Sequence, residues 1–204
     1  MNSAIAAPAG ATPRRTRPVV AVLAVQGAFV EHERKLERLG ATCFELRQRD
    51  DLERPFDALV LPGGESTVQG KLLRELGMLE PLRERIAGGL PALATCAGMI
   101  LLAECIAQGD GPYLATMPVT VRRNAYGRQL DSFRTHGDMV GIGRVPMTFI
   151  RAPYVEAVDP GVQVLAEVDG NVVAARFGNQ WALAFHPELD ECDAVHAAFL
   201  TSIG

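Results

Sequence analysis

Cys96 is the residue of this sequence best placed to act as a nucleophile. It follows a short apolar run, residues 92–95, which we predict to be a buried strand. Small residues, Ala97 and Gly98, come next and allow a tight turn, and helix-forming residues continue over 99–106. A thiol at such a turn lies beside the positive end of the helix dipole, which favours the reactive thiolate. The pattern predicts a nucleophile elbow with cysteine in place of serine, although a buried structural cysteine is an open alternative.

A candidate base and acid stand near the C-terminal end, in the segment His186-Pro187-Glu188. In an extended segment, residues two positions apart point the same way, so both side chains are expected to face a site at the end of the preceding strand. A neutral histidine deprotonates a thiol, and a carboxylate fixes the tautomer of that histidine and stabilises the imidazolium. With Cys96 they predict a nucleophile, a base and an orienting acid. Alone, this segment is more typical of a strand-end turn with a surface glutamate.

Two glycines, Gly63 and Gly64, follow another apolar run at residues 58–61. Glycines at this point allow unusual backbone angles and the close approach of a ligand. Ser66 and Gln69 match a capping box for the helix that comes next, so an ordinary strand-to-helix turn is the alternative. Ligands of parallel sheets bind at the carboxyl ends of strands, where we expect both this turn and the elbow cysteine.

The elements that must position these residues alternate between strand and helix in the first half of the chain. This order predicts an α/β fold with a mostly parallel sheet and helices on both faces. The second half is richer in strands and predicts an antiparallel meander. Residues 131–145 are polar and contain glycine, so we predict a flexible loop there. The expected strands are residues 19–25, 42–46, 58–61, 92–95, 119–122, 149–153, 162–168, 171–177 and 180–185, and a last helix is expected at 192–200.

The composition is that of an ordinary globular protein. The 204 residues are 48% hydrophobic and 22% charged, which predicts one domain over residues 18–204 with a sizeable core. Residues 1–17 predict a disordered extension. A net charge of −4, scattered lysines and arginines, and 6% aromatic residues argue against nucleic-acid binding. No apolar run reaches the ~18 residues of a membrane helix.

Cysteine and histidine usage points away from a metal site. The four cysteines form no C-x-x-C pair, and in a chain of this size they predict reduced thiols in the cytoplasm. Cys192 and His196 lie four positions apart on the last predicted helix, but two ligands do not make a metal site. His32 lies on the apolar face of a predicted helix, as a packed histidine would.

Together, the elbow cysteine, the double glycine and the terminal His-Pro-Glu segment resemble the class I, triad-type glutamine amidotransferases. Within that group the sequence resembles the glutaminase subunits of pyridoxal 5′-phosphate synthase, from about Val19 to the C-terminus. The resemblance implies a three-layer, flavodoxin-like α/β fold. The motifs that carry it are Val25-Gln26-Gly27, Glu31-His32, and residues 61–67, 95–98, 123–129, 149–153 and 185–189.

The resemblance also implies a role for each matching residue. Cys96 would attack the side-chain amide of L-glutamine, and a γ-glutamyl thioester would form and be hydrolysed. His186 would take the thiol proton and pass it to the leaving ammonia, and Glu188 would orient His186. The implied oxyanion-hole donors, a contribution commonly worth ~3–4 kcal/mol, are the backbone N–H groups of Gly63, Gly64 and Ala97. The implied glutamine-binding positions, where an arginine suits the substrate carboxylate, are Gly64, Glu65, Ser66, Arg123, Ile150 and Arg151.

A partner is implied as well. In this family the ammonia passes to a (β/α)₈-barrel synthase subunit, which combines it with ribose 5-phosphate and glyceraldehyde 3-phosphate to make pyridoxal 5′-phosphate. Twelve glutaminases decorate a twelve-subunit synthase core, and the glutaminase is nearly inactive until the partner docks. It needs no metal or cofactor of its own. The sequence departs from the family at the extension through Arg17, at Ala125-Tyr126 and at residues 134–147, and none of these touches the triad.

Three other functions are open on the sequence. Another triad glutaminase, feeding histidine or nucleotide synthesis, is disfavoured by the R-N-x-[FY]-G-R-Q pattern at residues 123–129. A free-standing cysteine hydrolase of other γ-glutamyl substrates would be active without a partner. A non-catalytic scaffold of the same fold would have no need to keep Cys96, His186 and Glu188 together.

Overall fold

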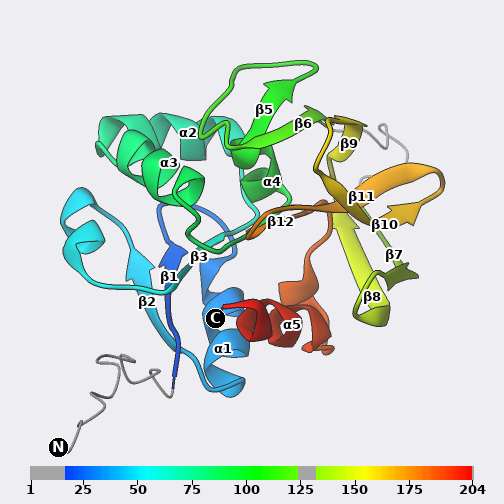
Figure 1. Ribbon diagram of the computed structural model, residues 1–204, viewed down its shortest axis with the longest axis horizontal. Coiled ribbons are helices and arrows are strands. Elements are labelled where there is room, and N and C mark those ends of the chain that lie inside the picture. Colours follow the sequence, from blue (N-terminus) through cyan, green and yellow to red (C-terminus); the bar gives the residue numbers. More distant parts are fainter. Residues whose placement is uncertain (1–16, 124–131, 204) are drawn as a thin grey trace, which may run out of the picture.

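The structure, a computed structural model, describes residues 17–123 and 132–203 (Figure 1). The predicted N-terminal extension lies outside these ranges except for Arg17. The motif at residues 123–129 also lies outside them, except for Arg123. The helices of the described part are α1 (Phe29–Arg38), α2 (Ser66–Glu75), α3 (Leu79–Ala87), α4 (Ala97–Leu102), α5 (Ala194–Ser202) and the 3₁₀ helices η1 (Arg49–Glu53) and η2 (Pro187–Leu189). Its strands are β1 (Val19–Leu23), β2 (Thr42–Leu46), β3 (Ala58–Leu61), β4 (Ala92–Thr95), β5 (Ala103–Ile106), β6 (Met117–Arg122), β7 (Ser132–Met139), β8 (Gly143–Ile150), β9 (Tyr154–Val158), β10 (Gln163–Val168), β11 (Asn171–Phe177) and β12 (Gln180–Leu183).

The main sheet has a parallel half and a mostly antiparallel half. Its strand order is β2-β1-β3-β4-β12-β11-β9-β6-β5, with β10 paired to β11. Every neighbouring pair from β2 to β12 is parallel. Strand β11 is antiparallel to β12, β10 and β9, and β9 is antiparallel to β6. The predicted parallel sheet with an antiparallel meander is thus confirmed, and β12 joins the two halves.

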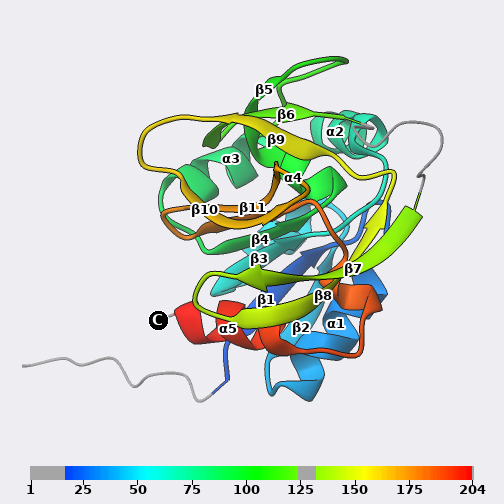
Figure 2. The same ribbon diagram turned by 90° about the vertical axis from the view of Figure 1, so that its right-hand side faces the viewer.

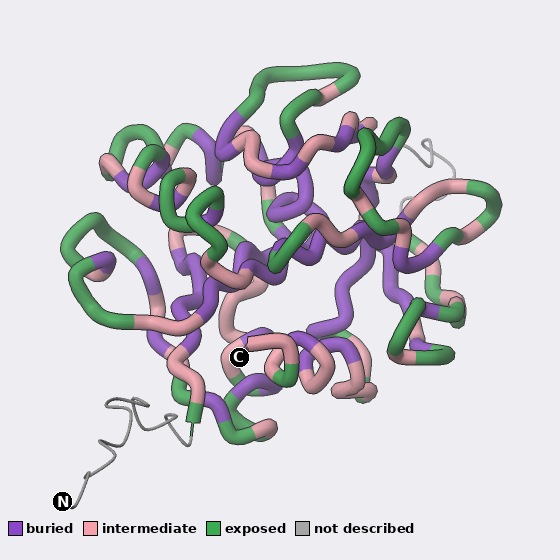
Figure 3. The backbone as a smooth tube through the Cα atoms, viewed as in Figure 1, coloured by how far each residue is buried: buried purple, intermediate pink, exposed green. Residues whose placement is uncertain are grey.

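Helices cover both faces of the parallel half. Figures 1 and 2 show α1 and α5 together on one face and α2, α3 and α4 on the other, which gives the predicted three layers. Strands β3, β4 and β12 are buried along their whole length, and Figure 3 shows these buried segments at the centre of the molecule. Strands buried on both faces need continuous apolar sequence rather than alternation, which is the pattern of residues 58–61 and 92–95.

The prediction of a flexible loop at residues 131–145 is wrong. Most of this segment belongs to a hairpin in which β7 and β8 pair antiparallel. The side chains of β7 alternate between more and less exposed, and Phe133 stacks on Phe149 with ring centroids 4.6 Å apart. One face of β7 is exposed and carries polar residues, so its composition alone suggests a loop, whereas the cross-strand pairing makes it a strand.

The prediction of a continuous helix from Met99 to Ile106 is wrong in its second half. Helix α4 ends at Leu102, and residues 103–106 form β5, which pairs parallel with β6. Helix propensity is a weak preference that pairing with a neighbouring strand overrides. Strand β9, which pairs with β6 on the side opposite β5, was not predicted either.

Candidate active site

Cys96 occupies the turn between β4 and α4, as predicted. Its φ of 48° and ψ of −101° are unusual for a residue with a side chain, and such strain is typical of nucleophile elbows. The turn is held by the backbone N–H of Cys96, which donates to the carbonyl of Leu183 at 2.7 Å. A Cβ on Gly98 would lie 2.1 Å from the Leu61 carbonyl oxygen, so only glycine lets α4 approach β3 this closely.

His186 and Glu188 come from the end of β12 and from η2. The extended geometry predicted for them is wrong, because Pro187–Leu189 forms a 3₁₀ turn. The turn nevertheless brings the two buried side chains together, with His186 Nδ1 2.6 Å from Glu188 Oε1. A carboxylate only accepts hydrogen bonds, so this contact assigns a proton to Nδ1 and leaves Nε2 for proton transfer. Nε2 has no regular hydrogen bond within the described residues, and His186 borders the same pocket as Cys96.

The electrostatics of the pair favour a charged imidazole. Burial by itself raises the pKa of Glu188, but His32 and His186 outweigh it and hold that pKa below its ordinary value. Burial likewise opposes a charge on His186, yet interactions with Cys96 and Glu188 raise its pKa to about 10. A raised pKa favours the protonated imidazole, which is the form that can donate a proton from Nε2.

Behind Glu188 lies a cluster of buried polar side chains to which the residue pattern gave no role. The rings of His32 on α1 and His196 on α5 meet at 3.0 Å between Nδ1 and Nε2. His32 Nε2 is also 3.1 Å from Thr95 Oγ1 and 3.4 Å from Glu188 Oε2. His32 is packed, as its helical position predicts, but it packs against polar atoms. The only feature of the sequence that indicated a role for His32 was its place in the Glu31-His32 motif.

A pocket of about 290 Å³ opens beside Cys96 and His186. All six predicted glutamine-binding residues border it, although they come from three separate parts of the chain. Gln26, Ile100 and Pro153 also border it without having been assigned a role. The lining residues are Gln26, Gly64, Glu65, Ser66, Cys96, Ala97, Ile100, Arg123, Ile150, Arg151, Pro153 and His186.

The two arginines of the pocket differ in their surroundings. Arg123 forms an ion pair with Glu65, whose Oε1 is 2.9 Å from the guanidinium. Arg151 has no salt-bridge partner among residues 17–123 and 132–203 and has a positive φ of 42°. One cation of the pocket is therefore neutralised and the other is available to an anionic group.

The start of α2 differs from the predicted capping box. Glu65 caps this helix, because its Oε2 accepts from the backbone N–H of Val68 at 3.0 Å. Gln69 instead donates to the carbonyl of Gln26 at 2.9 Å, which ties α2 to the turn after β1. Ser66 becomes the first residue of α2, and its buried hydroxyl has no hydrogen-bond partner in the described part of the chain. That hydroxyl is free to bind a ligand.

The double-glycine turn packs directly on the histidine of the site. A Cβ on Gly63 would lie 2.3 Å from His186 Cε1. In this conformation the Gly63 N–H donates to Thr95 Oγ1 at 3.0 Å, and the Gly63 carbonyl accepts from the Ala28 N–H at 3.0 Å. Of the predicted oxyanion donors, the Gly63 amide is thus engaged elsewhere, whereas Ala97, as the first residue of α4, has no acceptor within its helix.

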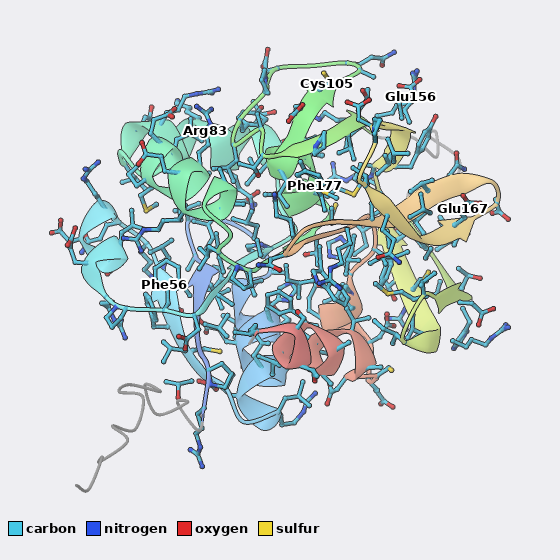
Figure 4. All side chains as sticks on the ribbon, viewed as in Figure 1. Phe56, Arg83, Cys105, Glu156, Glu167 and Phe177 are labelled. Carbon is cyan, nitrogen blue, oxygen red and sulfur yellow. The ribbon has the colours of Figure 1, made fainter. Side chains whose placement is uncertain are left out.

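Other kinds of site were sought in the same residues. Within residues 17–123 and 132–203, no three His, Cys, Asp or Glu side chains are grouped so that they could hold a metal ion. None of the helices in those ranges is long and apolar enough to cross a bilayer. All four cysteines are free, and Cys105 is exposed on β5 (Figure 4) and does not border the pocket beside Cys96.

Comparison with known proteins gives concordant results. The profile of the SNO glutamine amidotransferase family matches residues 22–203. The chain is similar to "Pyridoxal 5′-phosphate synthase subunit PdxT" of Desulfitobacterium hafniense (strain Y51), with 59% identity over 90% of this chain and 92% of that protein. A relative of the same name from Methanocorpusculum labreanum is 56% identical over 90% of this chain and 97% of its own. A solved structure described as a glutamine amidotransferase superposes with a TM-score of 0.86 at 42% identity, covering 91% of this chain and 98% of that one.

Proposed function

The chain belongs to the SNO glutamine amidotransferase family, and from this premise we propose that it is the glutaminase subunit of a pyridoxal 5′-phosphate synthase. It hydrolyses L-glutamine to L-glutamate and ammonia. The observation that carries the proposal is that a strained elbow cysteine, Cys96, and the buried His186–Glu188 pair meet at one pocket. The relatives that are named subunits of pyridoxal 5′-phosphate synthase support the destination of the ammonia.

In the proposed first half-reaction, the Cys96 thiolate attacks the amide carbon of the glutamine side chain. The S–C bond forms as the carbonyl electron pair moves to oxygen, which gives a tetrahedral intermediate. Collapse of this intermediate breaks the C–N bond, and the leaving nitrogen takes the proton from His186 Nε2. The products are ammonia and a γ-glutamyl thioester on Cys96.

In the second half-reaction, His186 Nε2 takes a proton from water while the oxygen attacks the thioester carbon. Collapse expels the Cys96 thiolate and leaves glutamate, and the imidazolium is again ready to give its proton. Glu188 holds the Nδ1 proton throughout, so that both transfers occur at Nε2. This division of roles requires the ring orientation that the 2.6 Å contact fixes.

The pocket lining supports glutamine as the substrate. The Arg151 guanidinium has no salt-bridge partner among the described residues and suits the substrate α-carboxylate, whereas Arg123 is held by Glu65. The Ser66 hydroxyl, buried and without a partner among the described residues, is available to a polar group of the bound amino acid. Gly64, Glu65, Arg123 and Ile150 complete the proposed glutamine-binding set.

We place the oxyanion hole at the backbone amides of Gly63, Gly64 and Ala97, and we propose that it is completed only when the partner docks. The Gly63 N–H and carbonyl are bound to Thr95 and to the Ala28 amide, so the turn must rearrange before all three donors face the substrate. The glycines allow such a change of backbone angles. A glutaminase that waits for its acceptor does not waste glutamine.

The partner in this proposal is a (β/α)₈-barrel synthase subunit that receives the ammonia and uses it with ribose 5-phosphate and glyceraldehyde 3-phosphate. Twelve glutaminases on a twelve-subunit core is the assembly implied by the family resemblance. No metal or cofactor takes part in the glutaminase steps.

The test is glutamate release from L-glutamine by the purified protein, alone and with a cognate synthase subunit, for the wild type and Cys96→Ala. We expect release that depends on the synthase and vanishes in the variant. Cys105→Ala, which removes an exposed thiol away from the site, is the matched control and should behave as wild type. Equal turnover with and without the synthase would contradict partner control, and full activity of Cys96→Ala would contradict the nucleophile.

A further inference from the structure

The buried histidines behind the triad form a continuous chain of contacts. It runs from His196 to His32, and from His32 to both Glu188 and Thr95. Thr95 in turn accepts a hydrogen bond from the Gly63 amide. The chain therefore connects two parts of the proposed active site that have no sequence proximity, the triad carboxylate and the glycine turn.

The proton positions in this chain follow from two independent observations. His196 Nδ1 is buried and has no hydrogen-bond partner in the described residues. A buried N–H without an acceptor is costly, so the His196 proton belongs on Nε2, from which it donates to His32 Nδ1. His32 then carries its own proton on Nε2, where it faces Glu188 and Thr95.

The charge on Glu188 selects the same tautomer. The opposite arrangement would point the lone pair of His32 Nε2 at a carboxylate oxygen 3.4 Å away. Burial lowers the pKa of His32 despite the nearby carboxylate, and burial lowers that of His196 well below its ordinary value, so both rings are neutral at neutral pH. The contact between His32 Nε2 and Glu188 Oε2, at 3.4 Å, is thus the approach of a neutral N–H to an anion rather than an ion pair, while the regular hydrogen bond of Nε2 is made to Thr95 Oγ1.

Glu188 needs such a neighbour. One of its oxygens is bound by His186, and the other, Oε2, is buried without a regular hydrogen bond from any described residue. His32 Nε2 is the ring nitrogen that faces this oxygen. An unsupported buried carboxylate oxygen would favour protonation of Glu188 and would release the orientation of His186.

We propose that His32, whose tautomer is locked by His196, is a positioning residue of the glutaminase that holds Glu188 and Thr95 at once. Through Glu188 it orients His186, and through Thr95 it contacts the hydroxyl that holds the Gly63 amide in the resting conformation of the oxyanion turn. It does not border the substrate pocket. The proposal rests on the proposed glutaminase function for its kinetic consequences, but its geometry does not depend on catalysis.

The first test therefore does not depend on glutaminase activity. Nitrogen-15 NMR of the histidine rings in the wild-type protein at neutral pH reports which nitrogen carries the proton. We expect both His32 and His196 to be neutral and protonated on Nε2. A proton on His32 Nδ1, or a doubly protonated His32, would overturn the proposal even if the protein proves to have no glutaminase activity.

The second test is the synthase-dependent glutaminase activity of His32 variants. In His32→Leu we expect kcat to fall about 10- to 100-fold, with KM within about 2-fold of wild type, because a donor to a charged group is lost outside the pocket. His32→Gln keeps an N–H donor and should recover much of the rate. The matched control is His136→Leu, which alters an exposed histidine on β7 and should leave kcat unchanged.

The pH profile separates positioning from a structural role. Without the His32 dipole the carboxylate is less stabilised, so the acidic limb of kcat/KM should move to higher pH in His32→Leu. The titratable groups that interact with His32 or Glu188 are His186, His196, Glu31 and Lys35, and all of them remain in the variant. A folded His32→Leu with wild-type kcat and pH profile would overturn the proposal. If this variant fails to fold, Thr95→Val decides. It removes the acceptor of the Gly63 amide, so glutamate release without the synthase should rise, and unchanged release would contradict the link to the glycine turn.

Discussion

Two residues of the pocket, Cys96 and Arg151, have positive φ angles of 48° and 42°. Residues with side chains seldom adopt this region, and each such case costs of order 1–3 kcal/mol that the surrounding structure must offset. Strain at two positions of one pocket is what a preorganised site requires. At Cys96 it places the thiol at the apex of the turn, and at Arg151 it fixes the backbone of a residue whose guanidinium has no salt-bridge partner in the described part of the chain.

Arg151→Gln should raise the KM for glutamine by about 10- to 100-fold and change kcat little, because the bidentate pair with the substrate carboxylate forms equally in the ground state and in the transition state. The measurement is steady-state glutamate release in the presence of the synthase. Arg134→Gln, on the exposed face of β7, is the matched control. A normal KM in Arg151→Gln would assign the carboxylate to another group.

The raised pKa of His186 predicts how stability depends on pH. The folded-state value is about 10 against an ordinary value of 6.5, so the stabilisation is fully present below pH 6.5 and is lost as the pH rises toward 10. The free energy of unfolding of the wild type should therefore exceed that of His186→Gln most at pH 6 and least at pH 10. Urea unfolding at several pH values measures this, and a difference independent of pH would argue against the charged imidazole.

At the scale of elements, the site depends on how closely α4 and β8 approach the sheet. Helix α4 lies against β3 because Gly98 has no side chain. Strand β8 supports the base, since the Thr148 carbonyl accepts from the His186 backbone N–H at 2.8 Å. Its last residue, Ile150, borders the pocket. The hairpin of β7 and β8, which the sequence composition suggests is a loop, thus helps to position the residues of the site.

Gly98→Ala should destabilise the protein by about 1–3 kcal/mol and lower activity, because its Cβ would lie 2.1 Å from a backbone oxygen of β3 and would push the elbow away. Thermal unfolding and glutamate release measure the two effects. Gly178→Ala is the control, since nothing lies within 4 Å of the new Cβ and only the positive φ is penalised, by about 1–2 kcal/mol. Equal losses of activity in the two variants would show that close packing at the elbow is unimportant.

At the scale of the whole molecule, the parallel pairing of β4 with β12 brings together the residues of the proposed triad. Thr95 pairs with Leu183, so the residues that follow each strand, Cys96 and His186, emerge at the same edge of the sheet. Strands β4 and β12 are neighbours in the sheet although a long stretch of sequence lies between them. The reactive pair therefore exists only in the folded chain.

A glutamine analogue with a diazoketone in place of the amide should label Cys96 in the folded protein and spare Cys105, although Cys105 is the exposed thiol. Recognition by the pocket and proton transfer from His186 outweigh accessibility. In urea the preference for Cys96 should disappear. Mass spectrometry of digested samples reads the site of labelling, and preferential labelling of Cys105 in the folded protein would contradict the assembled site.

The sequence by itself determined the parallel half of the fold and the identity of the candidate triad. Residues 58–61 and 92–95 are continuous apolar runs followed by small residues, and such local patterns depend on burial on both faces and on turn geometry. Cys96, His186 and the double glycine are recognisable only in combination, because each alone also fits a buried cysteine or an ordinary turn and the family resemblance joins them.

Only the tertiary structure decided the hairpin of β7 and β8, the end of α4 at Leu102 and the cap of α2 by Glu65. Each of these depends on a partner distant in sequence or on which of two neighbouring side chains reaches an amide. The same is true of His32, which helical spacing places on a buried face. Whether a buried histidine meets apolar side chains or a carboxylate is fixed by the elements packed against it, and here these are β4, η2 and α5.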